Sequence, residues 1–368
     1  GARSGMAHLL RCVRGGADNG QLTRPLTLVW DGPLATANGG SIAVINKAVT
    51  DTLREQGHHV FHGIPSVAKV TTNGGTPDVH VTHLWPGTSA HSVPNTDPGA
   101  WIIVQPWEHG PLPPEWARTW AHPKFRLLIT PSAYSERLFL DAYPELAGKT
   151  CVIPNGVNTS VFSPDGEKAP GRDDLWRCLF VGGAIWRKGV DRLYEAWRLA
   201  FPPEEGIHAV LVLKTQGRNT FYQGQSIDPP VDLIRPANVY PTISLIDRDM
   251  DATELAGIYR KVDCVVSPFR YEGFGMGMLE GMASGKPLVY SGHAPAIEFV
   301  AEGAGIAVPS VNHEVDVMSL ARALRWMFEN REAGVEMGRV GRVAAENYSW
   351  SRVAKLYSDR IKSIVASE

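Results

Sequence analysis

Short apolar segments alternate with amphipathic ones along most of this chain, and this alternation restricts its fold more than any other feature. The apolar segments lack the strict polar–apolar period of a strand with one solvent-exposed face, so they predict parallel strands buried on both faces. We predict strands at residues 26–31, 58–63, 78–84, 100–105, 125–130, 150–154, 177–183, 208–214, 237–242, 263–269, 286–292 and 305–309. The amphipathic segments predict helices at residues 40–56, 132–143, 188–200, 253–261, 276–284, 313–347 and 350–366.

Both halves of the chain show this strand–helix–strand succession, which is typical of doubly wound α/β domains. A length of 368 residues is sufficient for two of them. The stretch at 155–174, rich in Asn, Gly, Pro and Asp, has no apolar period and separates the halves. We therefore predict Rossmann-like domains over residues 25–165 and 166–349. Residues 1–24 carry no secretory signal, and we predict that they are partly disordered.

Charge and cysteine content narrow the functional class. The chain has 36 Lys and Arg against 38 Asp and Glu, without the basic excess of a dedicated nucleic-acid binder. No apolar run reaches the roughly 18–20 residues that cross a bilayer. The four cysteines form no CxxC pair, and the histidines show no metal-ligand spacing. These observations predict a cytoplasmic protein with free thiols, no bound metal and no nucleic-acid partner.

The loop after the predicted strand 263–269 carries the strongest functional signal. It contains Gly273, Gly275 and Gly277, which let the backbone approach a ligand closely, and it opens a helix whose amino terminus suits a diphosphate. Glu272 lies in the loop and Glu280 lies in the helix, so the two carboxylates could accept hydrogen bonds from two sets of sugar hydroxyls. The glycines alone favour a simple Gly-rich turn beside a helix.

The setting EGFG…LEGMASGKPLV around these glutamates resembles the donor-binding motif of the retaining family 4 glycosyltransferases. Further landmarks follow in the family's order from about residue 26 onward. They are the Gly39-Gly40 turn, PSAYSERLF at 131–139, PNGVNTSVFSP at 154–164, VGG…RKG at 181–189 and YSW at 348–350. The resemblance implies a GT-B fold, in which two Rossmann-like domains face a central cleft. It also implies that the terminal helix, within 350–368, crosses back to the first domain.

The resemblance implies a role for each matching residue. Glu272 would bind the hydroxyls of the transferred sugar, and Glu280 would bind the ribose. Gly275 and Met276 would offer backbone N–H groups to the sugar or to the distal phosphate. Lys188 would bind the diphosphate of a UDP- or GDP-sugar.

Other positions of the same motifs are also predicted to bind the donor. Gly273 and Phe274 lie in the loop between the two glutamates. Gly183 occupies a position where the family usually has Arg, and Arg187 could supply the missing guanidinium. Ile246 and Arg248 lie in a loop that relatives use for the nucleobase.

Two segments of the first domain are assigned less specifically. Glu108 and His109 follow the strand at 100–105, where relatives place a Glu or His near the reacting sugar, and their roles in sugar positioning or acceptor contact stay open. Gly39 and Gly40 could face the donor phosphates or simply allow a tight turn. Ser41, directly after them, could cap the following helix.

A second acidic segment has a structural explanation. Residues 247–251 contain two Asp-x-Asp strings, which bind a divalent metal in the other major glycosyltransferase fold. Here Asp251 and Glu254 instead have the spacing of a capping box at a helix start. We therefore assign no metal.

The resemblance implies transfer of a sugar to an acceptor hydroxyl with retention of anomeric configuration. A nucleotide-sugar epimerase, a phosphorylase or a non-catalytic nucleotide-sugar binder on the same fold are the alternatives. The acceptor could be a sugar, a lipid-linked molecule or another small molecule. Basic residues scattered over the first domain form a solvated face, with loose docking to the inner membrane face as the alternative. They are Arg118, Lys124, Arg126 and Arg137.

Overall fold

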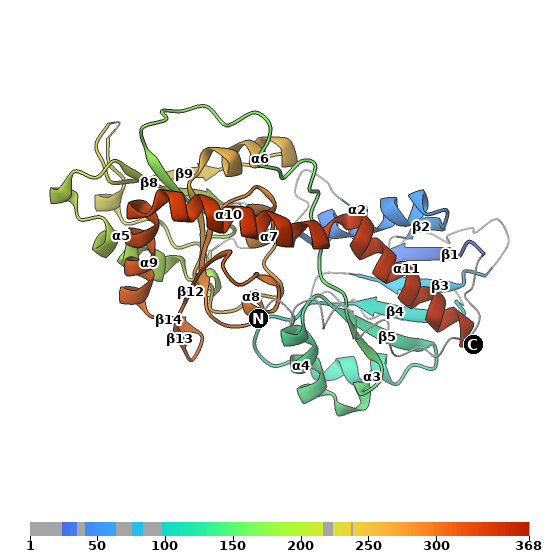
Figure 1. Cartoon of the computed structure of the whole chain (residues 1–368). Helices are drawn as coiled ribbons and strands as arrows, with labels where there is room; N and C mark the ends of the chain where they lie inside the picture. Colours follow the sequence, from blue (N-terminus) through green and yellow to red (C-terminus); the bar gives the residue numbers. More distant parts are fainter. Residues whose placement is uncertain are drawn as a thin grey trace. The chain divides into compact units, whose positions relative to one another are not determined.

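The computed structural model describes residues 24–34, 41–63, 76–83, 98–215, 224–236 and 238–367. These residues form two compact units (Figure 1). Val157–Asn347 make up the C-terminal unit, and the described residues before Val157 together with the chain from Tyr348 onward make up the N-terminal unit. The predicted disordered segment up to residue 23 and the Gly39-Gly40 turn lie outside the described residues.

The N-terminal unit contains a six-stranded parallel sheet in the order β2-β1-β3-β4-β5-β6. Its strands are β1 (Thr27–Asp31), β2 (His59–Gly63), β3 (Val79–Thr82), β4 (Ala100–Val104), β5 (Phe125–Thr130) and β6 (Thr150–Val152). Its helices are α2 (Ser41–Glu55), α3 (Ala117–Trp120), α4 (Ala133–Ala142) and α11 (Trp350–Ala366). Leu53 of α2 and Tyr357 of α11 lie in one buried cluster with Trp30 of β1, so the terminal helix completes the core of this unit.

The C-terminal unit contains a second six-stranded parallel sheet, in the order β12-β11-β10-β7-β8-β9. Its strands are β7 (Trp176–Val181), β8 (Ala209–Thr215), β9 (Thr242–Asp247), β10 (Cys264–Ser267), β11 (Leu288–Ser291) and β12 (Gly305–Val308), and a hairpin joins β13 (Ser310–Val311) to β14 (Glu314–Val315). Its α-helices are α5 (Val190–Ala200), α6 (Ala252–Lys261), α7 (Met276–Ala283), α8 (Ala296–Phe299), α9 (Val317–Glu329) and α10 (Arg331–Ala345).

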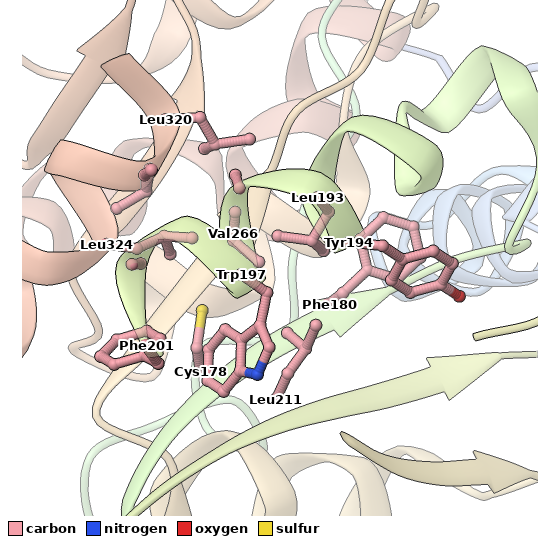
Figure 2. Packing of buried hydrophobic residues seen from close by; sticks show 14 of the residues in the cluster. Cys178, Phe180, Leu193, Tyr194, Trp197, Phe201, Leu211, Val266, Leu320 and Leu324 are labelled. Atoms are coloured by element: carbon pink, nitrogen blue, oxygen red, sulfur yellow. The ribbon is translucent and has the colours of Figure 1, made fainter. Parts of the chain in front are cut away.

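Aromatic side chains fill the core between α5 and this sheet (Figure 2). Trp197 of α5 stacks on Trp176 of β7 at 6.4 Å between ring centroids and meets Phe201 at 4.5 Å. Leu211 of β8 and Leu324 of α9 close the same cluster. Each such side chain contributes about 1.5–3 kcal/mol by leaving water, so α5 is held firmly at the edge where its preceding turn meets the candidate site.

The boundary between the units lies at Val157, ahead of the expected position after residue 165. Two arginines hold the intervening segment on the C-terminal unit. Arg260 of α6 donates to main-chain oxygens of Glu167, Val161 and Ser163. Arg342 of α10 donates to those of Thr159 and Phe162. Composition marked the segment as a linker, but these hydrogen bonds are long-range and leave no pattern in its sequence.

Two predicted elements are wrong. The strand expected at 237–242 is a turn in its described residues, and β9 begins only at Thr242. Pro236 and Pro241 explain the difference, since proline cannot donate to a sheet ladder. The helix expected over 313–347 starts at Val317 after the β13–β14 hairpin and is interrupted at Asn330, where α9 ends and α10 begins.

Other sequence predictions agree with the structure. The remaining predicted strands and helices are present, with small shifts at their ends. Cys151, Cys178 and Cys264 are buried, as expected from the apolar segments that contain them, and none of the three forms a disulfide within the described residues. No helix in the described part of the chain combines the length and apolarity needed to cross a bilayer.

Candidate active site

The loop that follows β10 turns sharply into α7 at Gly275. This residue has a φ of +110°, and a Cβ atom there would lie 2.3 Å from Cε of Met278. The left-handed backbone favours glycine at this position, and the Met278 side chain would have to move for any larger residue. The first N–H groups of α7 have no partner within the helix, so they form a local positive end that is suited to an anion.

Glu272, three residues before this turn, is buried and ionised. Its carboxylate forms an ion pair with Nζ of Lys188, and Nη1 of Arg187 lies 3.9 Å from Oε2. Burial alone would raise the pKa of Glu272, but the charges of Lys188 and Arg187 outweigh it and hold the pKa below its usual value. The carboxylate therefore remains a hydrogen-bond acceptor at neutral pH.

Lys188 reaches Glu272 from a short 3-10 turn, Trp186–Lys188, that precedes α5. The next residue, Gly189, has a φ of +70°, and a Cβ atom there would lie 1.9 Å from the main-chain oxygen of Pro268. The turn and the β10 loop can approach each other this closely only because the residue is glycine. Arg187 adds a second link, because its Nη1 donates to the main-chain oxygen of Tyr271 at 2.9 Å.

Arg270 fixes the same turn and loop from behind. Its guanidinium is only 3% exposed and forms paired hydrogen bonds with Asp191 of α5, both at 2.7 Å. It also pairs with Glu314 of β14 at 2.6 and 2.9 Å, and donates to the main-chain oxygen of Trp186 at 2.6 Å. Its own N–H donates to the oxygen of Arg187 at 2.9 Å. Sequence reasoning missed this residue, although an arginine inside an apolar run must find buried partners.

Glu280 has a different environment. The side chain is half-buried on α7, and its Oε2 lies 3.0 Å from the Tyr259 hydroxyl, which also lies 2.9 Å from the main-chain oxygen of Gly277. Burial raises the pKa of Glu280 to about 7, although the hydrogen bond from Tyr259 opposes that shift. Tyr259, on α6, was not identified from the sequence, because its link to Glu280 crosses from one helix to another.

The other predicted donor-binding residues occupy varied positions. Gly183 is buried after β7, and Phe274 is buried against Phe299 with ring centroids 4.7 Å apart. The Phe274 side chain thus belongs to the core, which leaves only its main chain for a ligand. Ile246 is half-buried in β9, and exposed Arg248 pairs with Glu254 at 2.9 Å.

The acidic segment before α6 is a helix cap. The Asp251 side chain accepts hydrogen bonds from the N–H groups of Thr253 and Glu254, and Glu254 completes the predicted capping box. Among the residues that the structure describes, no three His, Cys, Asp or Glu side chains gather closely enough to hold a metal ion.

Glu108 and His109 belong to the N-terminal unit, in the loop after β4. Glu108 is half-buried, and its main-chain oxygen accepts from the Tyr134 hydroxyl at 2.7 Å. The Ser135 hydroxyl accepts a hydrogen bond from the N–H of Trp107 and donates one to the main-chain oxygen of Trp107. The loop therefore has a fixed conformation that presents an exposed His109. The roles of Glu108 and His109 in a reaction stay predictions.

The comparisons with known proteins agree with this geometry. Residues 165–343 match the profile of the family Glycosyl transferases group 1. A glycosyltransferase of uncharacterised specificity from Methanocaldococcus jannaschii is 27% identical over 218 residues, covering 58% of this chain and 55% of the relative. The chain spans about half the length of the curated relatives that it matches.

Solved structures match nearly the whole chain at low identity. Sucrose-phosphate synthase from Thermosynechococcus elongatus has a TM-score of 0.68 at 17% identity, covering 93% of this chain and 100% of that one. Anabaena HepE in complex with UDP and glucose has a TM-score of 0.60 at 14% identity, covering 90% and 98%. These matches confirm the predicted GT-B fold of two Rossmann-like α/β units.

Proposed function

Since residues 165–343 match the profile of the family Glycosyl transferases group 1, we propose that the protein is a retaining glycosyltransferase that uses a nucleoside diphosphate sugar. The observation that carries the proposal is the cluster of Lys188, Arg187 and ionised Glu272 at the start of α7. It places two fixed cations and a helix amino terminus beside one carboxylate. This arrangement offers separate partners for a diphosphate and for sugar hydroxyls.

The cationic side of the cluster suits the leaving group. Negative charge grows on the diphosphate as the bond from the anomeric carbon to its phosphate oxygen breaks. Lys188, Arg187 and the free N–H groups of α7 are positioned in advance to stabilise that charge, which is the most effective form of electrostatic catalysis. The proposal assigns this work to the protein's own groups and adds no metal.

The acidic side of the cluster suits the transferred sugar. Glu272 carries only acceptor oxygens while it is ionised, so its natural partners are hydroxyl groups. In the structure Lys188 forms an ion pair with it. We propose that sugar hydroxyls bind Glu272 as the donor enters, while Lys188 contacts the diphosphate. The Glu280–Tyr259 pair would accept the ribose hydroxyls in the same way.

The chemical step needs no dedicated base from this unit. In the proposed step the acceptor oxygen bonds to the anomeric carbon on the face that the diphosphate leaves, so the configuration is retained. The acceptor hydroxyl proton passes to the departing phosphate oxygen. The protein contributes positioning and charge stabilisation. The structure of HepE with UDP and glucose supports a uridine donor on this fold, and a GDP-sugar remains within the proposal.

The proposal also covers the class of acceptor. We propose an acceptor hydroxyl on a sugar, a lipid-linked molecule or another small molecule, bound by the N-terminal unit with Glu108 and His109 as contact residues. The proposal places the protein in the cytoplasm, with loose attachment to the inner membrane face if the acceptor is lipid-linked. It includes no nucleic-acid partner.

The test is a donor screen with matched variants. Purified protein is incubated with UDP- and GDP-sugars, and release of free nucleoside diphosphate is measured with and without simple acceptors. Wild type should release it from one donor class, and Glu272→Gln should lose that release. Glu336→Gln, an exposed glutamate of α10 paired with Arg339, should behave as wild type.

Three other results would overturn the proposal. An epimerised donor without transfer would indicate an epimerase. Phosphate-dependent release of sugar phosphate would indicate a phosphorylase. Donor binding without turnover, across all donors and acceptors, would indicate a binding protein.

A further inference from the structure

One face of the C-terminal sheet is left partly uncovered at β8 and β9. The connection between these strands returns across the α5 face, where Leu233 joins the core cluster of Trp197. On the opposite face, α6 and residues 169–172 border a groove of about 450 Å³ over β8 and β9. This volume falls within the range of small-molecule sites, roughly 300–1,000 Å³.

The groove lies away from the candidate active site. The active-site loops follow the carboxyl ends of β7 and β10, whereas Arg177 and Val210 lie near the amino ends of β7 and β8. Val262, which also lines the groove, comes before β10 begins. At about 3.3 Å per residue, the length of a strand such as β7 separates the two ends by roughly 15–20 Å. Ile246, near the carboxyl end of β9, is the one lining residue that is also predicted to bind the donor. A ligand over Arg177, Arg235, Val210 and Val212 would therefore lie outside the donor site.

The floor of the groove is apolar. Val210 and Val212 of β8 point toward it and retain only 6% and 7% exposure. Ile246 of β9, together with Ile258 and Val262 from the α6 side, continues this surface. An apolar body would remove more of it from water than a bare ion could.

The rim of the groove is positively charged. Its lining residues include four cations and no acid: Arg172, Arg177, Arg235 and Lys261. Two of them are neutralised by acids outside the lining, because Arg172 pairs with Asp174 and Lys261 pairs with Asp173, both at 2.5 Å.

The other two cations form no ion pair with a carboxylate among the described residues, although Arg235 helps to lower the pKa of Asp232 and Arg177 helps to lower that of Asp173. The guanidinium of Arg177 donates to the main-chain oxygens of Leu175 and Arg172. Arg235 is the clearer case, since its Nε atom is buried and lacks a hydrogen-bond partner among the described residues. A buried guanidinium N–H without an acceptor is costly, and an anion in the groove would satisfy it.

We propose that this groove binds a small organic anion, with its phosphate or carboxylate on Arg235 and Arg177 and its apolar body over Val210 and Val212. The two halves of the ligand follow from the two halves of the groove. The site is separate from the proposed transfer reaction and does not depend on it.

Calorimetric titration with phenyl phosphate tests the proposal, because this probe combines a phosphate with an apolar ring. Phenyl phosphate should bind wild type at least fivefold more tightly than inorganic phosphate or phenol. Arg235→Gln should weaken it at least fivefold, and Arg322→Gln, an exposed arginine of α9, should not. Equal affinity in wild type and Arg235→Gln would overturn the proposal, as would equal affinity for inorganic phosphate.

A second pair of variants introduces charge without removing an arginine. Ser244→Glu places a carboxylate at the exposed groove wall on β9 and should weaken binding at least fivefold. Val231→Glu, at a side chain that is 86% exposed and outside the groove, is its control and should bind normally. The probe must also bind Lys188→Ala as it binds wild type. Loss of binding in Lys188→Ala would mean that the phosphate occupies the active site, and would overturn the groove assignment whether or not the protein transfers sugars.

Discussion

Glu272 and Glu280 lie on the same loop–helix segment and are both drawn out of solvent, yet their pKa values move in opposite directions. Lys188 and Arg187 hold the pKa of Glu272 below its usual value against the effect of burial. Among the residues that the structure describes, Glu280 has the neutral Tyr259 hydroxyl beside it and no cation, and burial raises its pKa to about 7. The sign of the shift is thus decided by the presence of a cation, and not by burial itself.

This difference matches the two ends of the proposed donor. At the Glu272 end the protein provides permanent charges of both signs, which suits a step in which charge develops. At the Glu280 end the described part of the chain provides two hydroxyl-binding oxygens without a cation, which suits a ribose that does not react. The following predictions test whether the two ends are as distinct as their electrostatics indicate.

Removing the charge of Lys188 should make the environment of Glu272 resemble that of Glu280. In Lys188→Ala, the pKa of Glu272 should rise, because the charge of Lys188 is the largest influence that lowers it. The same change removes stabilisation of the leaving diphosphate, so kcat should fall about 10²- to 10³-fold. Steady-state kinetics over pH would show both effects, as a loss of rate and an acid limb displaced to higher pH. Lys355→Ala, in an exposed pair with Asp359, is the control, and a loss below tenfold in Lys188→Ala would contradict the assignment.

Variants of Arg270 test whether the Glu272 end depends on the guanidinium that fixes the Lys188 turn. Arg270→Met leaves Asp191 and Glu314 without their shared partner and frees the turn that carries Lys188. Breaking a buried pair costs about 3–5 kcal/mol, and the partial exposure of both acids reduces our expectation to about 2–3 kcal/mol of unfolding free energy. Urea unfolding would measure it, with Arg322→Met as the exposed control.

Arg270→Lys separates positioning from fold stability. It keeps one charge but loses the planar fork that binds two carboxylates. Stability should recover in part, while kcat stays reduced because the Lys188 turn lacks its guanidinium support. Full recovery of kcat would mean that the charge alone is sufficient.

The sequence predicted the site residues that lie close to one another along the chain. The spacing of Glu272, Gly275 and Glu280 identified the loop and helix, and Lys188 stood at a recognisable helix start. The strands around them were predictable because residues buried on both faces form continuous apolar runs. Their order along the chain agrees with the observed sheets, whereas their ends shift by a few residues and the strand predicted at 237–242 begins only at Thr242.

The site residues that the sequence did not reveal are those that join segments far apart in the chain. Arg270 binds Asp191 and Glu314, which lie 79 and 44 residues away, and nothing in either segment marks the pairing. Tyr259 meets Glu280 across two helices, and no periodic pattern specifies that contact. The β14 strand was predicted as the start of a helix because its two residues are too few to show a period of two.

The contribution of Glu280 to donor affinity should depend on pH in a range where the contribution of Glu272 does not. Below pH 7 Glu280 becomes protonated and loses acceptor capacity, so donor affinity should fall about tenfold from pH 8 to pH 6, as the ionised fraction does for a pKa of about 7. Titration calorimetry with UDP-glucose or GDP-mannose avoids interference, because their diphosphates do not titrate in this range. Glu280→Gln should bind weakly with little dependence on pH. If the affinity of the wild-type protein did not change between pH 8 and pH 6, Glu280 would be excluded as the ribose acceptor.

The smallest expected effect isolates the single hydrogen bond that distinguishes Glu280 from an unpartnered buried acid. The Tyr259 hydroxyl lowers the pKa of Glu280 against the effect of burial, so Tyr259→Phe should raise that pKa further. At pH 7 fewer molecules would then hold an ionised Glu280, and donor affinity should fall about two- to fivefold, in line with the roughly 0.5–1.5 kcal/mol of one hydrogen bond. Raising the pH to 8.5 should restore most of the loss, which a simple packing defect would not allow. Tyr143→Phe removes a comparable hydroxyl from the N-terminal unit and should leave affinity unchanged at both pH values.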